Sequence, residues 1–328
     1  MPPVSSKTIA ATAAVLIVAL VAGCGDSDNG TGSRSKPAPA VADFPAADGR
    51  SLEQVLISAS NGQQGAVVAP AAAMFYVGTN RFPFGVFTAG QEQITDAQVA
   101  IYAAPGKGAK GPALGPFPAR IEDLTTKPAF RAKTTSDDPS AAQVAYVSDI
   151  PLERPGPWAF GALIKSGDSY QYSLLPTPHP VGEYPPPRVG QKAPVVHTPT
   201  VGEVSNISEI DTRVPPDDMH SDDLADVLGR KPVVLLFATP ALCLSRVCGP
   251  VTDEAAQVKQ EFGDRVAFIH QEVYNNNQIN DGPRPQMTAY GLSTEPWLFV
   301  IDRTGKVSSV LQGPFGVQEL EAAVQKVA

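Results

Sequence analysis

A run of prolines near the middle of the chain divides it into two segments with different hydrophobic patterns. The run lies between residues 176 and 194 and contains Pro178, Pro180, Pro185, Pro186, Pro187 and Pro194. Proline fixes its own φ angle and cannot donate a backbone hydrogen bond, so such a run favours a stiff, extended connector. We therefore predict two domains, residues 44–176 and 195–328, joined by a linker over residues 177–194.

The first segment has the pattern of an all-β domain. Apolar residues alternate with other residues in several short stretches, which is the period of a strand that buries one face. These stretches contain Phe82, Phe84 and Val86, then Val99 and Ile101, and later Trp158, Phe160, Ala162 and Ile164. After a short helix at 51–58, this spacing predicts an immunoglobulin-like β-sandwich. No pattern of catalytic residues accompanies it, and we expect a binding or spacing role.

The second segment alternates strand and helix patterns, which predicts an α/β domain. Residues 232–237 and 296–301 are apolar runs, as expected for strands covered on both faces. We predict further strands at 266–269 and 306–311, and a helix at 222–228 with Ser221 as its N-cap. Two more helices are indicated by apolar residues at helical spacing, namely Val247, Val251, Ala255, Val258 and Phe262, and then Val317, Leu320, Val324 and Val327.

The N-terminus has the pattern of an export signal. Lys7 precedes an apolar stretch over residues 8–22, which is shorter than the roughly 20 residues needed to span a bilayer but suits a signal-peptide core. The ending Val-Ala-Gly-Cys at residues 21–24 resembles the lipobox of bacterial lipoproteins. That resemblance implies cleavage before Cys24 and acylation of its sulfur. We therefore expect a signal peptide over 1–23, a disordered tether over 24–43, and a lipid anchor that holds the protein on the extracytoplasmic side of the cell membrane.

Charge and cysteine content narrow the function. The formal charge is −8 at pH 7 and no basic stripe is present, so we expect no nucleic-acid partner. The chain has three cysteines. If Cys24 is acylated, Cys243 and Cys248 remain as an even set in a compartment where disulfides form.

Two motifs of the second segment resemble the thioredoxin superfamily. Cys248-Gly249-Pro250 resembles the first three residues of its Cys-Gly-Pro-Cys motif, and residues 290–300 resemble the stretch that carries its cis-proline. The order of strands, helices and cysteines is also that of this superfamily. The resemblance covers residues 189–328. It implies a thioredoxin-like fold and a cis peptide bond before Pro296, packed opposite the cysteines.

The cysteine spacing departs from that motif. Val251 occupies the position of the usual second cysteine, so the partner of Cys248 must be Cys243. On one regular helix these two side chains would point about 140° apart, so a disulfide requires Cys243 to lie in the loop before the helix. A helix N-terminus lowers a thiol pKa. Arg246 would act in the same direction, and Glu295 would raise the pKa.

These features predict thiol–disulfide exchange with exported proteins, without a cofactor. The loop position of Cys243 favours it as the attacking thiol, whereas the Cys-Gly-Pro context favours Cys248. The alternative is a non-catalytic binding or scaffold protein in which a Cys243–Cys248 disulfide only stabilises the domain.

Two related families fit less well. Ser245 precedes Cys248 by three residues, as in peroxiredoxins, but Pro240 is one residue too far away and the activating arginine is missing. Copper-delivery proteins of cytochrome oxidase assembly have a shorter Cys-x3-Cys spacing and a histidine ahead of the later strand. Here His270 lies at the end of a different strand. It could substitute for that histidine, but a lone histidine after an apolar strand indicates a structural role. Because His179, His197 and His220 show no ligand spacing, and the aspartates of 217–223 suit a solvated loop, we expect no metal site.

Overall fold

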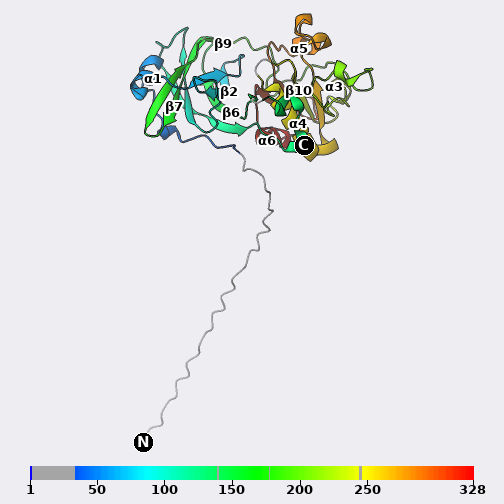
Figure 1. Cartoon of the computed structure of the whole chain (residues 1–328), viewed down its shortest axis with the longest axis horizontal. Coiled ribbons are helices and arrows are strands. Elements are labelled where there is room, and N and C mark those ends of the chain that lie inside the picture. The colour runs from blue at the N-terminus through cyan, green and yellow to red at the C-terminus, as the bar shows by residue number, and fades with distance from the viewer. Residues whose placement is uncertain (2–33, 139, 177, 244–245) are drawn as a thin grey trace. The chain divides into compact units, whose positions relative to one another are not determined.

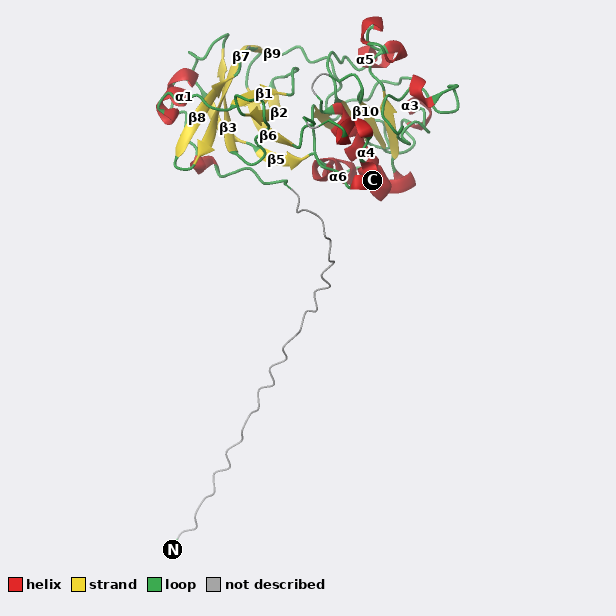
Figure 2. Cartoon of the chain, in the orientation of Figure 1, coloured by secondary structure: helices red, strands yellow, loops and turns green. Residues whose placement is uncertain are grey.

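The structure is a computed structural model that describes Met1 and residues 34–138, 140–176, 178–243 and 246–328. The predicted signal peptide after Met1, the predicted acylation site Cys24 and residues 25–33 of the predicted tether lie outside the described residues. The described residues from Arg34 to Ala328 belong to one compact unit, with a β-rich N-terminal half and an α/β C-terminal half (Figures 1 and 2). Over the described ranges, no helix combines the length and the apolar character needed to cross a membrane.

The N-terminal half contains two antiparallel sheets. The first has the order β1 (Val67–Pro70), β2 (Gly78–Phe87), β6 (Val144–Leu152), β5 (Arg120–Asp123). The second has the order β4 (Leu114–Pro118), β3 (Gln98–Pro105), β7 (Gly156–Ser166), β8 (Ser169–Leu174), and β9 (His179–Val181) also pairs with β7. The apolar residues that the alternation placed on common faces form one core between these sheets, which includes Phe82, Phe84, Ile101, Tyr146 and Phe160.

Helix α1 (Leu52–Ser60) covers the other face of the second sheet. It begins after Ser51, whose side chain accepts a hydrogen bond from the backbone of Gln54 in a capping box. Its apolar face packs on alternate residues of β3 and β7, in a second core that includes Leu52, Val55, Leu56, Ala100, Tyr102 and Leu163. The predicted helix is therefore confirmed, and β3 is buried on both faces.

The C-terminal half is built on a four-stranded sheet with the order β11-β10-β12-β13. Strand β10 (Val233–Phe237) pairs in parallel with β11 (Ala267–Gln271) and antiparallel with β12 (Trp297–Ile301), which continues into β13 (Val307–Gln312). Helix α4 (Cys248–Phe262) connects β10 to β11, and α6 (Val317–Gln325) follows β13. This order of strands and helices is the topology of the thioredoxin fold, so the predicted thioredoxin-like fold of this half is confirmed.

Both faces of this sheet are covered. Val234 and Leu236 of β10 pack with α4 and α6. Val233, Leu235 and Phe237 pack on the opposite side with residues of α3 (Leu224–Val227) and α5 (Pro285–Ala289). The remaining helical segments are α2 (Lys133–Ser136) and short 3-10 turns at Val41–Asp43, Pro128–Phe130, Ile207–Glu209, Gly263–Arg265, Asn275–Asn277 and Ile279–Asp281.

The structure differs from the sequence-based expectation in three segments. Part of the tether is ordered, because Lys36 exchanges two backbone hydrogen bonds of 2.9 Å with Ile121 of β5. Part of the proline-rich linker is strand β9, and Ala193 near its end is buried in a core. Helix α3 is shorter than predicted, and its N-cap is Asp223 rather than Ser221, since the carboxylate of Asp223 accepts the backbone N–H of Ala225. The residues that order the tether and the linker are distant from them in sequence, so composition does not reveal these contacts. The N-cap of α3 depends on which of two nearby acidic or hydroxyl residues faces the first turn, and composition does not reveal that either.

A buried ion pair joins the two halves. Arg81 of β2 donates to both carboxylate oxygens of Glu319 on α6, over 2.8 and 2.7 Å, and Arg120 donates to the same carboxylate over 2.6 Å. The side chains of Arg81 and Glu319 are only 12% and 13% exposed. Burial raises the pKa of Glu319, but the two arginines outweigh burial, and the pKa is lowered overall.

We predict that Arg81→Ala lowers the free energy of unfolding by about 3–5 kcal/mol, because it leaves the Glu319 carboxylate buried beside a weaker partner. Urea denaturation measures this change. The matched control is Lys36→Ala, which breaks an exposed pair with Asp96 and should cost less than about 1 kcal/mol. Because the folded-state pKa of Glu319 is lowered, its contribution is present above the pKa of an unfolded glutamate and is lost as the pH falls through the folded-state pKa. If Arg81→Ala and Lys36→Ala had the same free energy of unfolding, the assignment of a stabilising buried pair between Arg81 and Glu319 would be contradicted.

Candidate dithiol site

The two cysteines of the C-terminal half lie at the N-terminus of α4 and in the loop that precedes it. Strand β10 ends at Phe237, and Cys248 is the first residue of α4. Cys243 lies in the intervening loop, where its backbone N–H donates to the carbonyl oxygen of Thr239 over 3.1 Å. This is the loop position that a bond between the two sulfurs requires.

The side chains of Cys243 and Cys248 are hydrogen-bonded to each other, and both are thiols. The predicted disulfide is the two-electron oxidised form of the same contact, and it is not formed here. Cys243 and Cys248 are five residues apart in sequence. Their side chains meet because the chain changes from loop to helix between them.

The two thiols differ in burial. Cys248 is fully buried, whereas Cys243 is partly exposed. Burial is the largest cause that raises the pKa of Cys248 well above its usual value, and the hydrogen bond with Cys243 and the charge of Glu295 act in the same direction. A hydrogen bond from the backbone of Thr239 lowers the pKa but does not compensate. The sequence left open the balance between a helix N-terminus and Arg246, which would lower the thiol pKa, and Glu295, which would raise it. In the structure burial dominates, and the pKa of Cys248 is raised.

The carboxylate of Glu295 lies beside the pair. The peptide bond between Glu295 and Pro296 is cis, as predicted, and Pro296 is buried immediately before β12. Burial raises the pKa of Glu295, and so does the charge of Cys243, while a hydrogen bond with Tyr274 lowers it. Its effect on Cys248 has the direction that the sequence predicted.

Tyr274 is a member of this site that the sequence did not reveal. Its pKa is raised by burial first, and then by the nearby charges of Glu295, Cys243 and Cys248. Tyr274 follows β11 in an asparagine-rich turn, and no motif marks it. The tyrosine reaches the cysteines only because β11 and β10 are parallel neighbours, so that their carboxyl ends meet at one edge of the sheet.

Arg246 does not point its charge at the sulfurs. Its guanidinium donates a hydrogen bond to the hydroxyl of Ser140 and lies 4.0 Å from the carboxylate of Asp138, both in the N-terminal half. Its backbone is left-handed, with a φ of 58°, and its side chain is 58% exposed. The predicted lowering of the thiol pKa by Arg246 therefore finds no support in this geometry. The acceptors that attract the guanidinium are about a hundred residues away in sequence.

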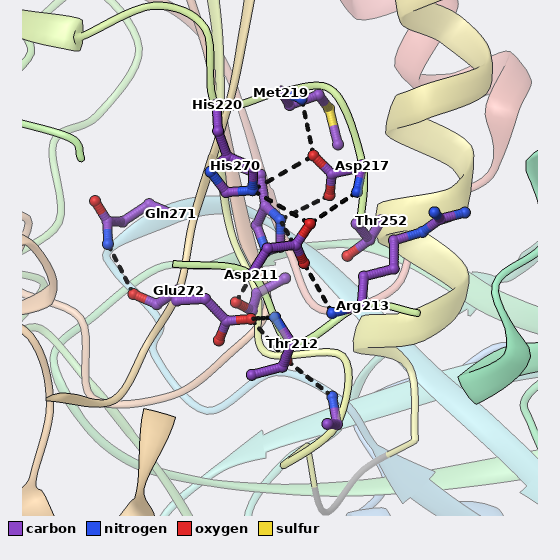
Figure 3. Close-up of polar contacts among 12 residues, drawn as sticks. Asp211, Thr212, Arg213, Asp217, Met219, His220, Thr252, His270, Gln271 and Glu272 are labelled. Atoms are coloured by element: carbon purple, nitrogen blue, oxygen red, sulfur yellow. Dashed lines mark hydrogen bonds and ion pairs between the residues drawn. The ribbon is translucent and has the colours of Figure 1, made fainter. Parts of the chain in front are cut away.

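A second polar cluster lies against the start of the cysteine loop (Figure 3). His270 at the end of β11 contacts Asp217 through Nδ1 over 2.8 Å and the carbonyl oxygen of Ala238 through Nε2 over 3.2 Å. Burial alone would lower the pKa of His270, but Asp217 raises it to about 10, and the pKa of Asp217 is lowered to about 2. Asp211 and His220 complete the cluster. The sequence predicted a solvated loop for the aspartates of 217–223 and a structural role for His270. The loop prediction is wrong for Asp217, whose side chain is buried beside the two histidines.

Comparisons with known proteins add little to this picture. No family model matches the chain, and no curated protein matches it. Two solved structures from Chlorobium tepidum are similar to part of it: a thioredoxin-family thiol:disulfide interchange protein at 21% identity, and a protein described as the thiol:disulfide interchange protein DsbE at 18% identity. Each match covers 43% of this chain and 97% of the other, with TM-scores of 0.30 and 0.31. The thioredoxin-like fold of the C-terminal half rests on its strand order.

We predict that iodoacetamide modifies Cys243 at least about tenfold faster than Cys248 in the folded protein. Alkylation of Cys248 requires a local opening, and a tenfold difference corresponds to an opening free energy of only about 1.4 kcal/mol. Mass spectrometry of peptides from timed samples measures both rates. In denaturant the two rates should converge, which serves as the control. Equal rates in the folded protein would show that Cys248 is accessible.

Proposed function

We propose that this protein exchanges thiols and disulfides with exported proteins through Cys243 and Cys248. The observation that carries the proposal is the hydrogen-bonded contact between a partly exposed thiol and a fully buried one at the N-terminus of α4. The exposed thiol of Cys243 can meet a disulfide of another protein. The buried thiol of Cys248 can react with little besides Cys243, which suits the second step of an exchange.

In the first step, Cys243 attacks. Its thiolate displaces one sulfur of a substrate disulfide, so that a bond forms between Cys243 and the substrate while the substrate's own S–S bond breaks. The displaced sulfur leaves as a thiolate and takes up a proton. Because Cys248 keeps its proton, its thiol can donate the hydrogen bond that stabilises the thiolate of Cys243.

In the second step, Cys248 resolves the mixed disulfide. It loses its proton and attacks the sulfur of Cys243, which releases the second substrate thiolate and leaves a Cys243–Cys248 disulfide. We assign the acceptance of this proton to Glu295, whose charge acts on Cys248 and whose own pKa is raised by burial. Pro296 directly follows Glu295 and is assigned a positioning role. The net reaction reduces a substrate disulfide, and its reverse oxidises a substrate dithiol.

The alternative is a scaffold in which the pair is a structural disulfide. The complete burial of Cys248 favours this reading, as does the buried ion pair that unites both halves into one unit. The reduction potential of the pair separates the two functions, because structural disulfides have potentials below about −300 mV, whereas exchange proteins lie between about −270 and −120 mV.

We further propose that the N-terminal half is an immunoglobulin-like sandwich with a binding or spacing role. Two observations support this fold. If β1 to β8 are read as strands A, B, C, C′, D, E, F and G, the first sheet has the order A-B-E-D and the second C′-C-F-G. The two sheets also share one core between their facing sides.

The exchange mechanism predicts different outcomes for the two cysteines. In a Cys24→Ser background, Cys248→Ser should accumulate mixed disulfides with exported proteins, because the resolving thiol is missing. Cys243→Ser should form none, and only the unmodified pair should reduce insulin. Non-reducing gels and mass spectrometry detect the adducts, and equilibration with glutathione gives the potential. A potential below about −300 mV without any adduct or insulin reduction would support the scaffold instead.

The proposed lipid anchor at Cys24 predicts a change of location. Cys24→Ser should lose incorporation of labelled palmitate and move from the membrane fraction to the soluble fraction, because the acyl chains supply about 0.8 kcal/mol of membrane affinity per buried methylene. Cys243→Ser is the matched control and should remain in the membrane fraction. Palmitate labelling that persists in the Cys24→Ser variant would rule out this anchor.

A further inference from the structure

We propose that Asp211, Asp217, His220 and His270 bind one divalent transition-metal ion, with Zn²⁺ as the probe. All four side chains are buried: the side chains of His220 and Asp217 are each only 1% exposed, and those of Asp211 and His270 are fully covered. Three of them come from the long loop between β9 and β10, and the fourth ends β11 (Figure 3). This site is separate from the two cysteines, and its existence does not depend on thiol exchange.

The spacing of the ligand atoms suits a small ion. One atom from each residue lies within 4.8 Å of all the others. Nε2 of His220 lies 3.5 Å from a carboxylate oxygen of Asp211 and 3.5 Å from one of Asp217. Nδ1 of His270 lies 3.9 Å from Asp211 and 2.8 Å from Asp217. Four ligands at about 2.1 Å from a tetrahedral zinc ion are separated by about 3.4 Å, which is within the observed range.

His220 supplies an independent sign of a ligand. Neither of its ring nitrogens forms a hydrogen bond with any part of the chain that the structure describes, although the ring is almost completely buried. A buried polar group without a partner is destabilising, so native proteins rarely leave one. Nε2 lies 3.5 Å from an oxygen of each carboxylate, which is too long for a good hydrogen bond. The same distance suits three ligand atoms that bind one cation between them. A bound ion would satisfy this nitrogen.

Neighbouring groups orient three of the four residues, Asp211, Asp217 and His270, as the outer shell of a metal site does. Nε2 of His270 faces the carbonyl oxygen of Ala238 over 3.2 Å, so Nδ1 is the nitrogen directed toward the carboxylates. Backbone N–H groups orient both carboxylates: Arg213 and Asp217 donate to Asp211 over 2.8 and 2.7 Å, and Met219 donates to Asp217 over 2.8 Å. Metal-binding histidines and carboxylates are typically fixed by such bonds.

The donor set indicates the class of metal. Two imidazole nitrogens and two carboxylate oxygens suit Zn²⁺ and similar first-row cations, whereas Ca²⁺ and Mg²⁺ prefer oxygen ligands alone. The two carboxylates also balance the charge of a divalent ion. Because four protein ligands close the site and bury it, we assign a structural role. The ion would fasten the 211–220 loop to the end of β11 and, through His270, to Ala238 at the start of the cysteine loop.

The test uses the full chain with all three cysteines replaced by serine, so that the thiols cannot bind the metal. After dialysis against a chelator, this protein should bind one equivalent of Zn²⁺ by calorimetry and elemental analysis, as should the wild type. His220→Gln in the same background should weaken Zn²⁺ binding by more than the roughly 10- to 100-fold that loss of an outer-shell partner costs. The matched control is His197→Gln, since His197 also faces two carboxylates but at the surface, and it should bind like the parent.

A spectrum of bound Co²⁺ tests the site without either histidine variant. Co²⁺ added to the cysteine-free chain should give the visible bands of a tetrahedral ion without a thiolate-to-metal charge-transfer band. Zn²⁺ should also raise the thermal midpoint of the His197→Gln chain and leave that of His220→Gln unchanged. The proposal is overturned if the cysteine-free chain binds no metal, or if His220→Gln and His197→Gln bind Zn²⁺ equally. Loss of thiol exchange in the wild type would not affect either result.

Discussion

The burial of β10 on both faces is the constraint on which the site depends. All five residues of this strand are buried, and they alternate between two cores that α4 and α6 close on one side and α3 and α5 on the other. The strand is therefore fixed in register between β11 and β12. Where it ends, the next two residues serve two different clusters: the carbonyl oxygen of Ala238 faces His270, and the backbone of Thr239 faces the sulfur of Cys248.

Desolvation decides the chemistry of the two thiols. A helix N-terminus, a backbone hydrogen bond and a nearby arginine would all favour a thiolate at Cys248, yet its pKa is raised. Complete burial removes water from the charged form, Glu295 adds a negative charge nearby, and Arg246 is directed to another part of the chain. The proposed exchange divides the roles accordingly, with the partly exposed sulfur of Cys243 as the attacking one and the buried thiol of Cys248 as the resolving one.

The long loop between β9 and β10 is held by polar contacts more than by helices or strands. Arg213 illustrates this: it pairs with the buried carboxylate of Asp253 on α4 and also donates to the carbonyl oxygen of Phe130 in the N-terminal half. Three residues of the cluster around His270, namely Asp211, Asp217 and His220, lie in the same loop. A cation bound there would link this loop to the segment that carries the cysteines. The link would run through His270 and the carbonyl oxygen of Ala238, and the ion would not contact the sulfurs.

The sequence by itself determined the C-terminal fold, the cis bond before Pro296, the start of α4 near Cys248 and the sandwich faces of the N-terminal half. The helix start and the strand faces follow from local periodicity, in which the informative residues are near one another in the chain. The thioredoxin-like fold and the cis bond are what the resemblance of Cys248-Gly249-Pro250 and residues 290–300 to the thioredoxin superfamily implied. Tertiary structure decided the rest: the burial that sets the pKa of Cys248, the arrival of Tyr274 at the site, the diversion of Arg246 to Ser140, and the meeting of Asp211, Asp217 and His220 with His270. Each of these depends on a partner that is distant in sequence or on the exclusion of water, and neither property is written in the spacing of residues along one segment.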